Sequence, residues 1–441
     1  MNVTVENLAP CKKLLRVEVD TPAVDAAFNE VTQDFRKQAR LPGFRPGKSP
    51  LHLVVKAFTA QIDNEVKRKL LSESYRQAIA EQKLRVVGQP DIEEIQFAKG
   101  QPYQFAVTLE TAPEFELPEY KGLPVKREMA VVTEEDIERA VNILREQRAT
   151  YIDVDREVRD GDFVVVNYTG TCDGRPITET APTARGLTEK QGFWLHVQKD
   201  SFVPGFTEQL IGGKAGEKRT VTVDFPAQFV TPQLSGKQGV YEVEIVQVKE
   251  KVLPEANDEF ARSYDAPDLA KLRAGVVADL ESELNQKIKR SVRDQLRREL
   301  INRVKCELPE SIVLNETRSA VYDIVRENQQ RGVPKATLEQ QKDQIFSVAN
   351  TSAKDRIKAA FILGVIAEKE GIKADEKEIQ QRILWLAQQY SISPEQMIKQ
   401  LRERNGVAEI AEQIVTAKVF DFLELQARVE DVLPGAGTPT A

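Results

Sequence analysis

The chain has 441 residues and a formal net charge of −7, from 62 lysines and arginines against 69 aspartates and glutamates. At roughly 150 residues per domain, this length predicts about three domains. The negative balance argues against a protein that coats nucleic acid along its whole length. Nothing approaches the roughly 18 consecutive apolar residues of a membrane-spanning helix. The N-terminus also lacks the pattern of a secretory signal, so we expect a cytoplasmic protein.

Side chains suited to covalent or metal chemistry are scarce. The chain has two histidines and three cysteines, at His52, His196, Cys11, Cys172 and Cys306. The cysteines lie far apart and form no C-x-x-C motif, which is typical of free thiols in a reducing compartment. We therefore expect no metal site, no catalytic triad and no cofactor.

The first 112 residues carry the alternating patterns of a mixed α/β domain. Apolar and polar residues alternate over 15–19 and again over 103–109, which predicts two strands. Between them, Thr21-Pro22 supplies a helix N-cap followed by proline at the first helical position. Apolar residues then recur at steps of three and four, which predicts helices between the strands.

The middle of the chain changes character twice. Prolines recur in the acidic stretch 113–124, which predicts an extended linker. Residues 133–136 form a capping signal that opens a helix. From about 151 to 250, short β-rich runs alternate with Gly-containing turns, the pattern of a small antiparallel sheet domain.

Beyond Pro254 the pattern is almost wholly helical. Aliphatic residues run at steps of three and four from Leu269 to Val304, which predicts one helix about 55 Å long. Shorter helices follow, interrupted by proline and glycine. Residues 431–441 have the composition of a disordered tail.

The segment Gly43-Phe-Arg-Pro-Gly-Lys-Ser-Pro50 has the composition of a basic surface tip. It is not a phosphate-binding loop, because three residues rather than four separate its glycines and Pro46 lacks a backbone donor. Between Arg36 and Lys56 there are six basic residues and no acidic one. Such a tip indicates docking to an anionic surface, such as RNA with its associated protein. On charge alone, an ordinary solvated loop remains the alternative.

The string G-F-R-x-G-K-x-P resembles the ribosome-binding signature of trigger factor, a family of bacterial ribosome-associated chaperones. The resemblance implies that Phe44, Arg45 and Lys48 contact the large ribosomal subunit beside the polypeptide exit tunnel. The full set of motif residues that it assigns to ribosome binding is Gly43, Phe44, Arg45, Pro46, Gly47, Lys48 and Pro50.

A second motif begins at Asp160-Gly-Asp162 and continues in Phe202-Val-Pro-Gly-Phe206. It resembles the FKBP-type prolyl isomerase domain, whose pocket is aromatic. The resemblance implies a catalytic pocket at the matching positions, which are Tyr168, Ile177 on the rim, Phe193, Phe202, Val203, Phe206, Phe229 and Tyr241. Two positions depart from the pattern, with Phe206 in place of an indole and Thr178 in place of an acid.

Prolyl isomerisation suits a site without acids, bases or metals. Rotation about an X–Pro bond loses amide resonance, with a barrier of roughly 18–20 kcal/mol. A dry aromatic pocket favours the twisted amide, which is less polar than the planar one. In the FKBP family, the backbone N–H at the Val203 position holds the preceding carbonyl.

The order of segments resembles trigger factor from end to end and implies a multidomain α+β protein. Its expected parts are an N-terminal α/β ribosome-docking domain (1–112), a linker and a helix that packs with the C-terminal domain (113–150), an FKBP-like antiparallel sheet domain (151–250), an all-α C-terminal chaperone domain with helical arms (251–430) and a disordered tail (431–441). The helices around 311–332 and 337–349 are the candidates for an arm.

The function implied is an ATP-independent, ribosome-associated chaperone that holds nascent chains and isomerises X–Pro bonds. Its partners would be the large ribosomal subunit and nascent or unfolded polypeptides, without a membrane or free nucleic acid. Two alternatives stay open: a stand-alone FKBP-type isomerase with helical dimerisation or adaptor extensions, and a structural coiled-coil adaptor. Whether the chain forms a homodimer off the ribosome also stays open.

Overall fold

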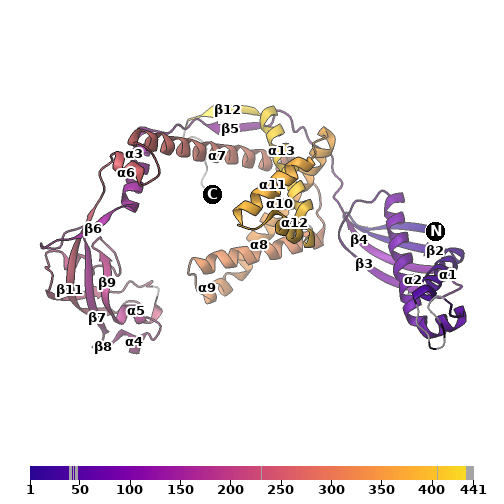
Figure 1. Cartoon of the computed structure of the whole chain (residues 1–441), viewed down its shortest axis with the longest axis horizontal. Helices are drawn as coiled ribbons and strands as arrows, with labels where there is room; N and C mark the ends of the chain where they lie inside the picture. The colour runs from indigo at the N-terminus through magenta and orange to yellow at the C-terminus, as the bar shows by residue number, and fades with distance from the viewer. Residues whose placement is uncertain (39–41, 43, 45–47, 230, 405, 434–441) are drawn as a thin grey trace. The chain divides into compact units, whose positions relative to one another are not determined.

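The computed structural model describes residues 1–433 except 39–41, 43, 45–47, 230 and 405. The chain divides into two compact units, residues 1–129 with 288–441 and residues 130–287. Figure 1 shows an N-terminal sheet with two long helices, a second sheet domain and a largely helical C-terminal region. The predicted multidomain α+β class is therefore confirmed.

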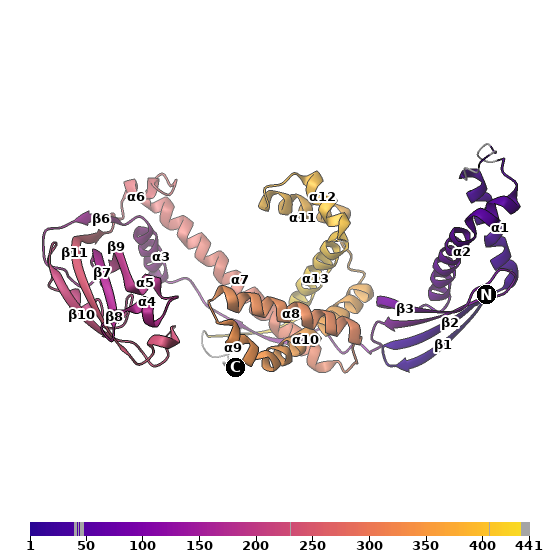
Figure 2. The ribbon, with the colours of Figure 1, turned by 90° about the horizontal axis from the view of Figure 1, so that it is seen from below.

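The N-terminal domain is a four-stranded antiparallel sheet with helices packed on one face (Figure 2). Leu15 and Val17 on one strand and Phe105 and Val107 on its neighbour share a core with Val66 of the second helix. The alternation over 15–19 and 103–109 had predicted both strands, and the structure confirms them. The elements are β1 (Asn2–Ala9), β2 (Lys12–Val19), α1 (Thr21–Gln38), α2 (Leu51–Glu81), β3 (Val86–Gln96) and β4 (Tyr103–Thr111), in sheet order β1-β2-β4-β3.

The segment predicted as a linker contributes to a core. β5 (Pro124–Glu128) pairs in parallel with β12 (Arg428–Val432) near the other end of the chain. Leu123 and Val125 are buried among helical residues that include Leu296. Ordered backbone thus continues to Val432, past the point where the tail was expected to begin, because β5 supplies hydrogen-bond partners for it. Residues 434–441 of the expected tail lie outside the described residues.

The helical region follows the sequence prediction closely. α7 (Leu269–Arg303) matches the aliphatic stripe, and α3 (Glu134–Gln147) begins with the predicted capping box between Thr133 and Asp136. The expected arm corresponds to α8 (Glu310–Gln330), α9 (Lys335–Gln340) and the start of α10 (Lys342–Glu370). The other helices are α6 (Asp258–Arg262), α11 (Glu376–Gln389), α12 (Pro394–Glu403) and α13 (Gly406–Gln426).

The second unit is built on a six-stranded antiparallel sheet. Its strands are β6 (Thr150–Asp153), β7 (Phe163–Cys172), β8 (Arg175–Pro176), β9 (Glu189–His196), β10 (Lys218–Asp224) and β11 (Gln238–Val252). Two one-turn helices, α4 (Ile177–Thr180) and α5 (Arg185–Thr188), lie between β8 and β9. The inner face of the sheet carries the core, in which Val166 and Val243 are fully buried.

Among the described residues, no helix is long and apolar enough to cross a membrane. The same part of the chain contains no group of three or more His, Cys, Asp or Glu side chains arranged to hold a metal ion.

Candidate functional site

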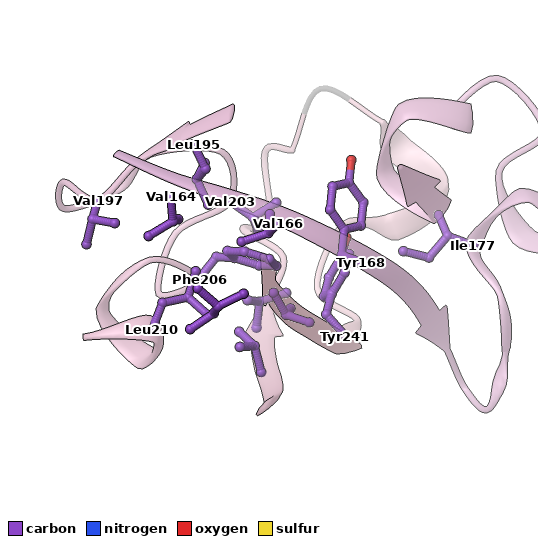
Figure 3. Close-up of a cluster of buried hydrophobic side chains, with 14 of the residues drawn as sticks. Val164, Val166, Tyr168, Ile177, Leu195, Val197, Val203, Phe206, Leu210 and Tyr241 are labelled. Atoms are coloured by element: carbon purple, nitrogen blue, oxygen red, sulfur yellow. The ribbon is translucent and has the colours of Figure 1, made fainter. Parts of the chain in front are cut away.

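Two central strands place the tyrosines of the predicted pocket. Tyr168 on β7 lies opposite Val243 on β11, and Tyr241 lies opposite Gly170. Because side chains alternate between the faces of a sheet, both tyrosines point to the inner face. Their ring centroids are 6.0 Å apart, and the close-up in Figure 3 shows them in one cluster with Phe206.

Gly170 leaves the space that the Tyr241 ring occupies. A Cβ atom at Gly170 would lie 2.5 Å from the Tyr241 ring and 2.7 Å from the carbonyl oxygen of Leu187. Both distances are shorter than a van der Waals contact allows, so only glycine fits between the ring and the chain of α5. The sequence analysis did not identify Gly170, because a glycine inside a strand pattern does not reveal which ring lies over it.

The loop after β9 places a third aromatic ring beside the two tyrosines. Phe206 is fully buried, and its ring centroid lies 5.2 Å from that of Tyr241 in an edge-to-face arrangement. The Thr207 hydroxyl donates a hydrogen bond to the Gln198 carbonyl at 2.7 Å, which closes the loop behind Phe206. A benzyl side chain in place of the family's indole therefore still packs against the sheet.

Phe193 and Phe202 complete what we call the aromatic cluster. The ring of Phe202 lies 5.2 Å from Tyr168, 5.3 Å from Phe193 and 5.0 Å from Phe206, measured between centroids. Tyr241 is slightly farther from it, at 6.3 Å. The aromatic cluster thus contains Tyr168, Phe193, Phe202, Phe206 and Tyr241, all five from the predicted set.

The three remaining predicted residues lie around this cluster. Ile177 at the start of α4 and Val203 in the loop are fully buried in the same core. Phe229 packs against that core from one side, and its ring lies 4.9 Å from Phe225. The structure therefore brings all eight predicted positions into one domain core, with Phe229 at its edge.

Burial keeps both phenols of the cluster neutral. The Tyr168 hydroxyl donates to the Gly186 carbonyl, and burial raises the pKa of the Tyr168 phenol. Burial also raises the pKa of the Tyr241 phenol far above its usual range, and its hydroxyl has no hydrogen-bond partner among the described residues. The two phenols thus add no charge to the cluster at neutral pH.

The backbone at Val203 differs from the expectation. Its N–H, which the family resemblance assigned to the substrate carbonyl, donates to the carbonyl of Ser201 at 2.9 Å. The residue between them, Phe202, has a positive φ of 66°. The tight turn at Phe202 brings the two groups together, so the N–H is already occupied in this structure.

Lys190 lies at the edge of the aromatic cluster, a position that the sequence did not reveal. Its Nζ is 4.8 Å from the centroid of the Phe193 ring. The ladder between β7 and β9 pairs Lys190 with Tyr168 and has an irregularity before Phe193. That irregularity breaks simple alternation along β9, so the face of Lys190 could not be read from spacing alone.

His196 has no contact with the aromatic cluster. It lies on β9 with its ring stacked on Phe163 at 4.4 Å, close to the exposed Trp194 and Tyr151. This confirms the prediction of a strand-surface histidine. This imidazole is therefore not part of the predicted set of pocket residues.

The basic tip lies between α1 and α2 of the N-terminal domain. Phe44 is 41% exposed and Lys48 is exposed, whereas Pro50 directly precedes the first residue of α2. The Ser49 carbonyl accepts a hydrogen bond from the Arg36 Nε at 2.9 Å, which fixes the end of the tip to α1. Four predicted residues of the tip, Gly43, Arg45, Pro46 and Gly47, lie outside the described residues.

Comparison with known protein families agrees with this arrangement. Residues 154–246 match the family described as FKBP-type peptidyl-prolyl cis-trans isomerase, so the sheet domain with the aromatic cluster is an isomerase domain of that class. Residues 1–144 match the family described as bacterial trigger factor protein, and residues 268–424 match the C-terminus of that family.

Relatives similar over nearly the full length identify the family. A trigger factor of Opitutus terrae is 33% identical over 98% of this chain and 100% of its own length. One of Caldicellulosiruptor saccharolyticus is 30% identical, with 97% of each chain covered. A solved structure of a trigger factor chaperone covers 96% of this chain and 99% of its own, with 19% identity and a TM-score of 0.46. The two relatives that are 30% identical or more over nearly the full length show that the chain belongs to the trigger factor family.

It is thus a trigger factor chaperone with an FKBP-type peptidyl-prolyl isomerase domain. Membership in this family implies the ribosome and nascent polypeptides as partners. The alternatives of a stand-alone isomerase and a coiled-coil adaptor are excluded, because the parts before and after the isomerase domain match trigger factor as well.

Proposed function

We propose that the aromatic cluster is the active site for the isomerisation of X–Pro bonds, and that the basic tip docks the chain on the large ribosomal subunit beside the exit tunnel. The residues assigned to catalysis are Tyr168, Ile177, Phe193, Phe202, Val203, Phe206, Phe229 and Tyr241. Those assigned to ribosome binding are Gly43, Phe44, Arg45, Pro46, Gly47, Lys48 and Pro50. Docking on ribosomes also assigns the protein to the cytoplasm.

One observation carries the catalytic assignment: five aromatic rings converge on one face of the sheet, and the Lys190 ammonium lies only at their edge, beside Phe193. A planar X–Pro amide is strongly polar, and it loses resonance and polarity as it twists. Because the cluster offers few polar partners to the planar amide, it favours the twisted form relative to water. No proton transfer or covalent intermediate is needed.

The fully buried Phe206 of the aromatic cluster gives a direct test of this assignment. Phe206→Ala removes the ring that lies 5.2 Å from Tyr241, so isomerisation of a short X–Pro peptide should fall by at least tenfold. Trp194→Ala is the matched control, because Trp194 is a half-exposed aromatic residue of the same domain on β9. Full activity in a correctly folded Phe206→Ala variant would refute the assignment.

The ribosome-binding assignment depends on exposure and charge. Phe44 and Lys48 are exposed at a tip whose charged residues, from Arg36 to Lys56, are all basic. A phosphate-rich surface therefore attracts the tip, and the aromatic ring of Phe44 adds apolar contact.

For the holding of unfolded chains, we propose the helical part of the protein, residues 251–430. Several large apolar side chains on α8 and α10 are exposed, including Tyr322, Phe346 and Val348. Exposed apolar residues among dense charges can bind unfolded segments weakly and reversibly, which suits release without ATP. We also propose the expected boundaries 1–112, 113–150 and 151–250 for the preceding parts of the chain.

A further inference from the structure

Phe202 differs from the other members of the aromatic cluster in where its ring lies. Its centroid is within 5.0–5.3 Å of three rings of the cluster, those of Tyr168, Phe193 and Phe206, and 6.3 Å from the fourth, Tyr241. Tyr168 also has all four other rings as neighbours, but at longer centroid distances of 5.2–6.4 Å. Phe202 is only partly buried, whereas Tyr168, Phe206 and Tyr241 are buried, so its ring covers the three buried rings from the more exposed side.

The backbone of Phe202 is in a conformation that phenylalanine rarely adopts. Its φ of 66° is in the left-handed region, which disfavours residues with a Cβ. The hydrogen bond from the Val203 N–H to the Ser201 carbonyl closes a three-residue turn with Phe202 in the middle. Turns of this kind with a positive central φ are uncommon and strained. The ring contacts of Phe202 must offset this strain.

The Phe202 ring and the Phe202 turn each involve a part of the site that the proposed mechanism assigns to the substrate: the space beside the buried rings and the Val203 N–H. If the prolyl ring of a substrate contacts Tyr168, Phe206 and Tyr241, it competes for space with the Phe202 ring, which lies 5.2, 5.0 and 6.3 Å from those three rings. A substrate carbonyl bound by the Val203 N–H requires the donor that Ser201 occupies. One rotation of the backbone at Phe202 would release both the ring position and the N–H.

We propose that Phe202 is an internal competitor of the substrate: in the free enzyme its ring fills the prolyl position and its turn engages the Val203 N–H. This inference rests on the proposed active site and revises the role of one residue assigned to it, because Phe202 then blocks the site in the free enzyme and does not act on the substrate. Substrate binds only to the fraction of molecules in which Phe202 has moved out. Minor conformations of proteins are commonly populated at about 10% or less, and the apparent affinity falls by the same fraction.

The proposal reverses the expected effect of one substitution. If Phe202 is part of the wall, Phe202→Ala removes contacts with the substrate and kcat/KM falls, as for Phe206→Ala. If Phe202 competes with the substrate, Phe202→Ala empties the prolyl position and KM falls, so kcat/KM rises by about tenfold. Phe202→Leu, with a smaller side chain that still packs on the cluster, should give a rise of intermediate size.

The experiment measures steady-state isomerisation of a Leu-Pro-Phe peptide by the full-length protein and its Phe202→Ala, Phe202→Leu and Phe206→Ala variants. Near-ultraviolet circular dichroism checks the packing of each variant. A fall or no change in kcat/KM for both folded Phe202 variants overturns the inference, while a loss in Phe206→Ala leaves the active site itself in place. If neither Phe202 nor Phe206 substitution changes activity, the active-site assignment fails together with the inference.

A second measurement does not depend on a substitution. In the wild-type protein, the amide proton of Val203 should exchange slowly with solvent and its nuclear magnetic resonance signal should shift when the peptide is added, because it changes its acceptor. An amide signal that stays constant through saturation with peptide contradicts the exchange of partners, whatever the kinetics of the variants.

Discussion

The Arg156 guanidinium donates two hydrogen bonds to the buried Asp162 carboxylate, at 2.6 and 2.9 Å. The same carboxylate accepts the backbone N–H of Arg159 at 2.8 Å, and Arg156 also reaches Glu250 on β11 at 2.9 Å. These contacts join the loop before β7 to the long strand β11. Since β7 and β11 carry Tyr168 and Tyr241, this ion pair fixes the strands that position the aromatic cluster.

Removal of the Asp162 carboxylate should destabilise the isomerase domain. Asp162→Ala leaves the partly exposed Arg156 guanidinium with Glu250 as its remaining carboxylate partner, and loss of one partner of a part-buried hydrogen-bonded group costs about 1–3 kcal/mol. We expect a loss of that size in the free energy of unfolding, measured with urea and followed by near-ultraviolet signals. Asp162→Asn should cost less, because the amide oxygen still accepts from the Arg159 N–H.

A double substitution checks that the loss comes from this pair. Arg156→Ala with Asp162→Ala should cost less than the sum of the two single changes, because neither charge is left alone. Additive losses would show that the two side chains stabilise the domain independently.

The two buried phenols predict how stability depends on pH. The folded state holds the pKa of Tyr241 above the ordinary value of 10.0 because burial disfavours the phenolate. Above about pH 10 the unfolded chain loses this proton while the folded domain retains it, so stability falls as the pH rises, by up to about 1.4 kcal/mol per unit. Below pH 9 these phenols contribute no pH dependence.

Urea unfolding between pH 7 and pH 11 measures this slope. Tyr241→Phe removes one of the two buried titrating phenols and should make the fall above pH 10 less steep. A fall that is equally steep in Tyr241→Phe and in the parent protein would assign the pH dependence to other groups.

The sequence predicted some parts of this fold well because their signals are local. The capping box at Thr133 and the stripe over 269–304 depend only on neighbouring residues, and both agree with α3 and α7. The pairing of β5 with β12 joins residues about 300 positions apart and follows no local rule, so residues 113–124 predicted only a linker.

The same contrast holds at the candidate site. The family motif selected eight positions that do share one core, because a motif records which residues converge. It gave no indication of the tight turn at Phe202, since phenylalanine is a poor residue for positive φ and only the ring contacts around it explain the conformation. Nor did it show that Gly170 makes room for Tyr241, because that contact depends on strand register.

Docking on the ribosome should depend on the tip between α1 and α2. Changing Phe44, Arg45 and Lys48 together to alanine should abolish co-sedimentation with purified ribosomes, because it removes one aromatic and two cationic side chains from the predicted binding motif. Substitutions on such exposed sites usually change stability by no more than about 0.5 kcal/mol, so the domain should stay folded. Binding by the parent protein should also weaken as salt is raised.

The control for this experiment is a triple alanine variant that removes side chains of the same kinds from another part of the N-terminal domain. Ile95, Lys12 and Arg16 are exposed on the N-terminal sheet, and changing them to alanine also removes one apolar and two cationic side chains. That variant should sediment with ribosomes as the parent does. Equal loss in both variants would mean that general charge, and not the tip, governs binding.

The holding of unfolded clients should survive removal of the isomerase domain. β6 and β11 pair antiparallel, with Asp153 opposite Lys249, so the two ends of residues 154–248 lie side by side and a short loop can join them. A variant in which a short loop replaces residues 154–248 should suppress the aggregation of a denatured protein about as well as the full chain, without ATP. It should have no isomerase activity, because it lacks the aromatic cluster.

Substitutions on the helical region should give the opposite result. Changing Tyr322, Phe346 and Val348 to serine removes exposed apolar surface from α8 and α10, with Tyr322 as much as 66% exposed, so client binding should weaken while the isomerase domain is untouched. Light scattering of a denatured client diluted into each variant at equal molarity measures suppression, and a peptide assay measures isomerisation. Trp194→Ser, which removes an exposed aromatic residue from the isomerase domain, is the control. Full suppression by the triple variant, or a loss as large in the control, would move the client surface away from these helices.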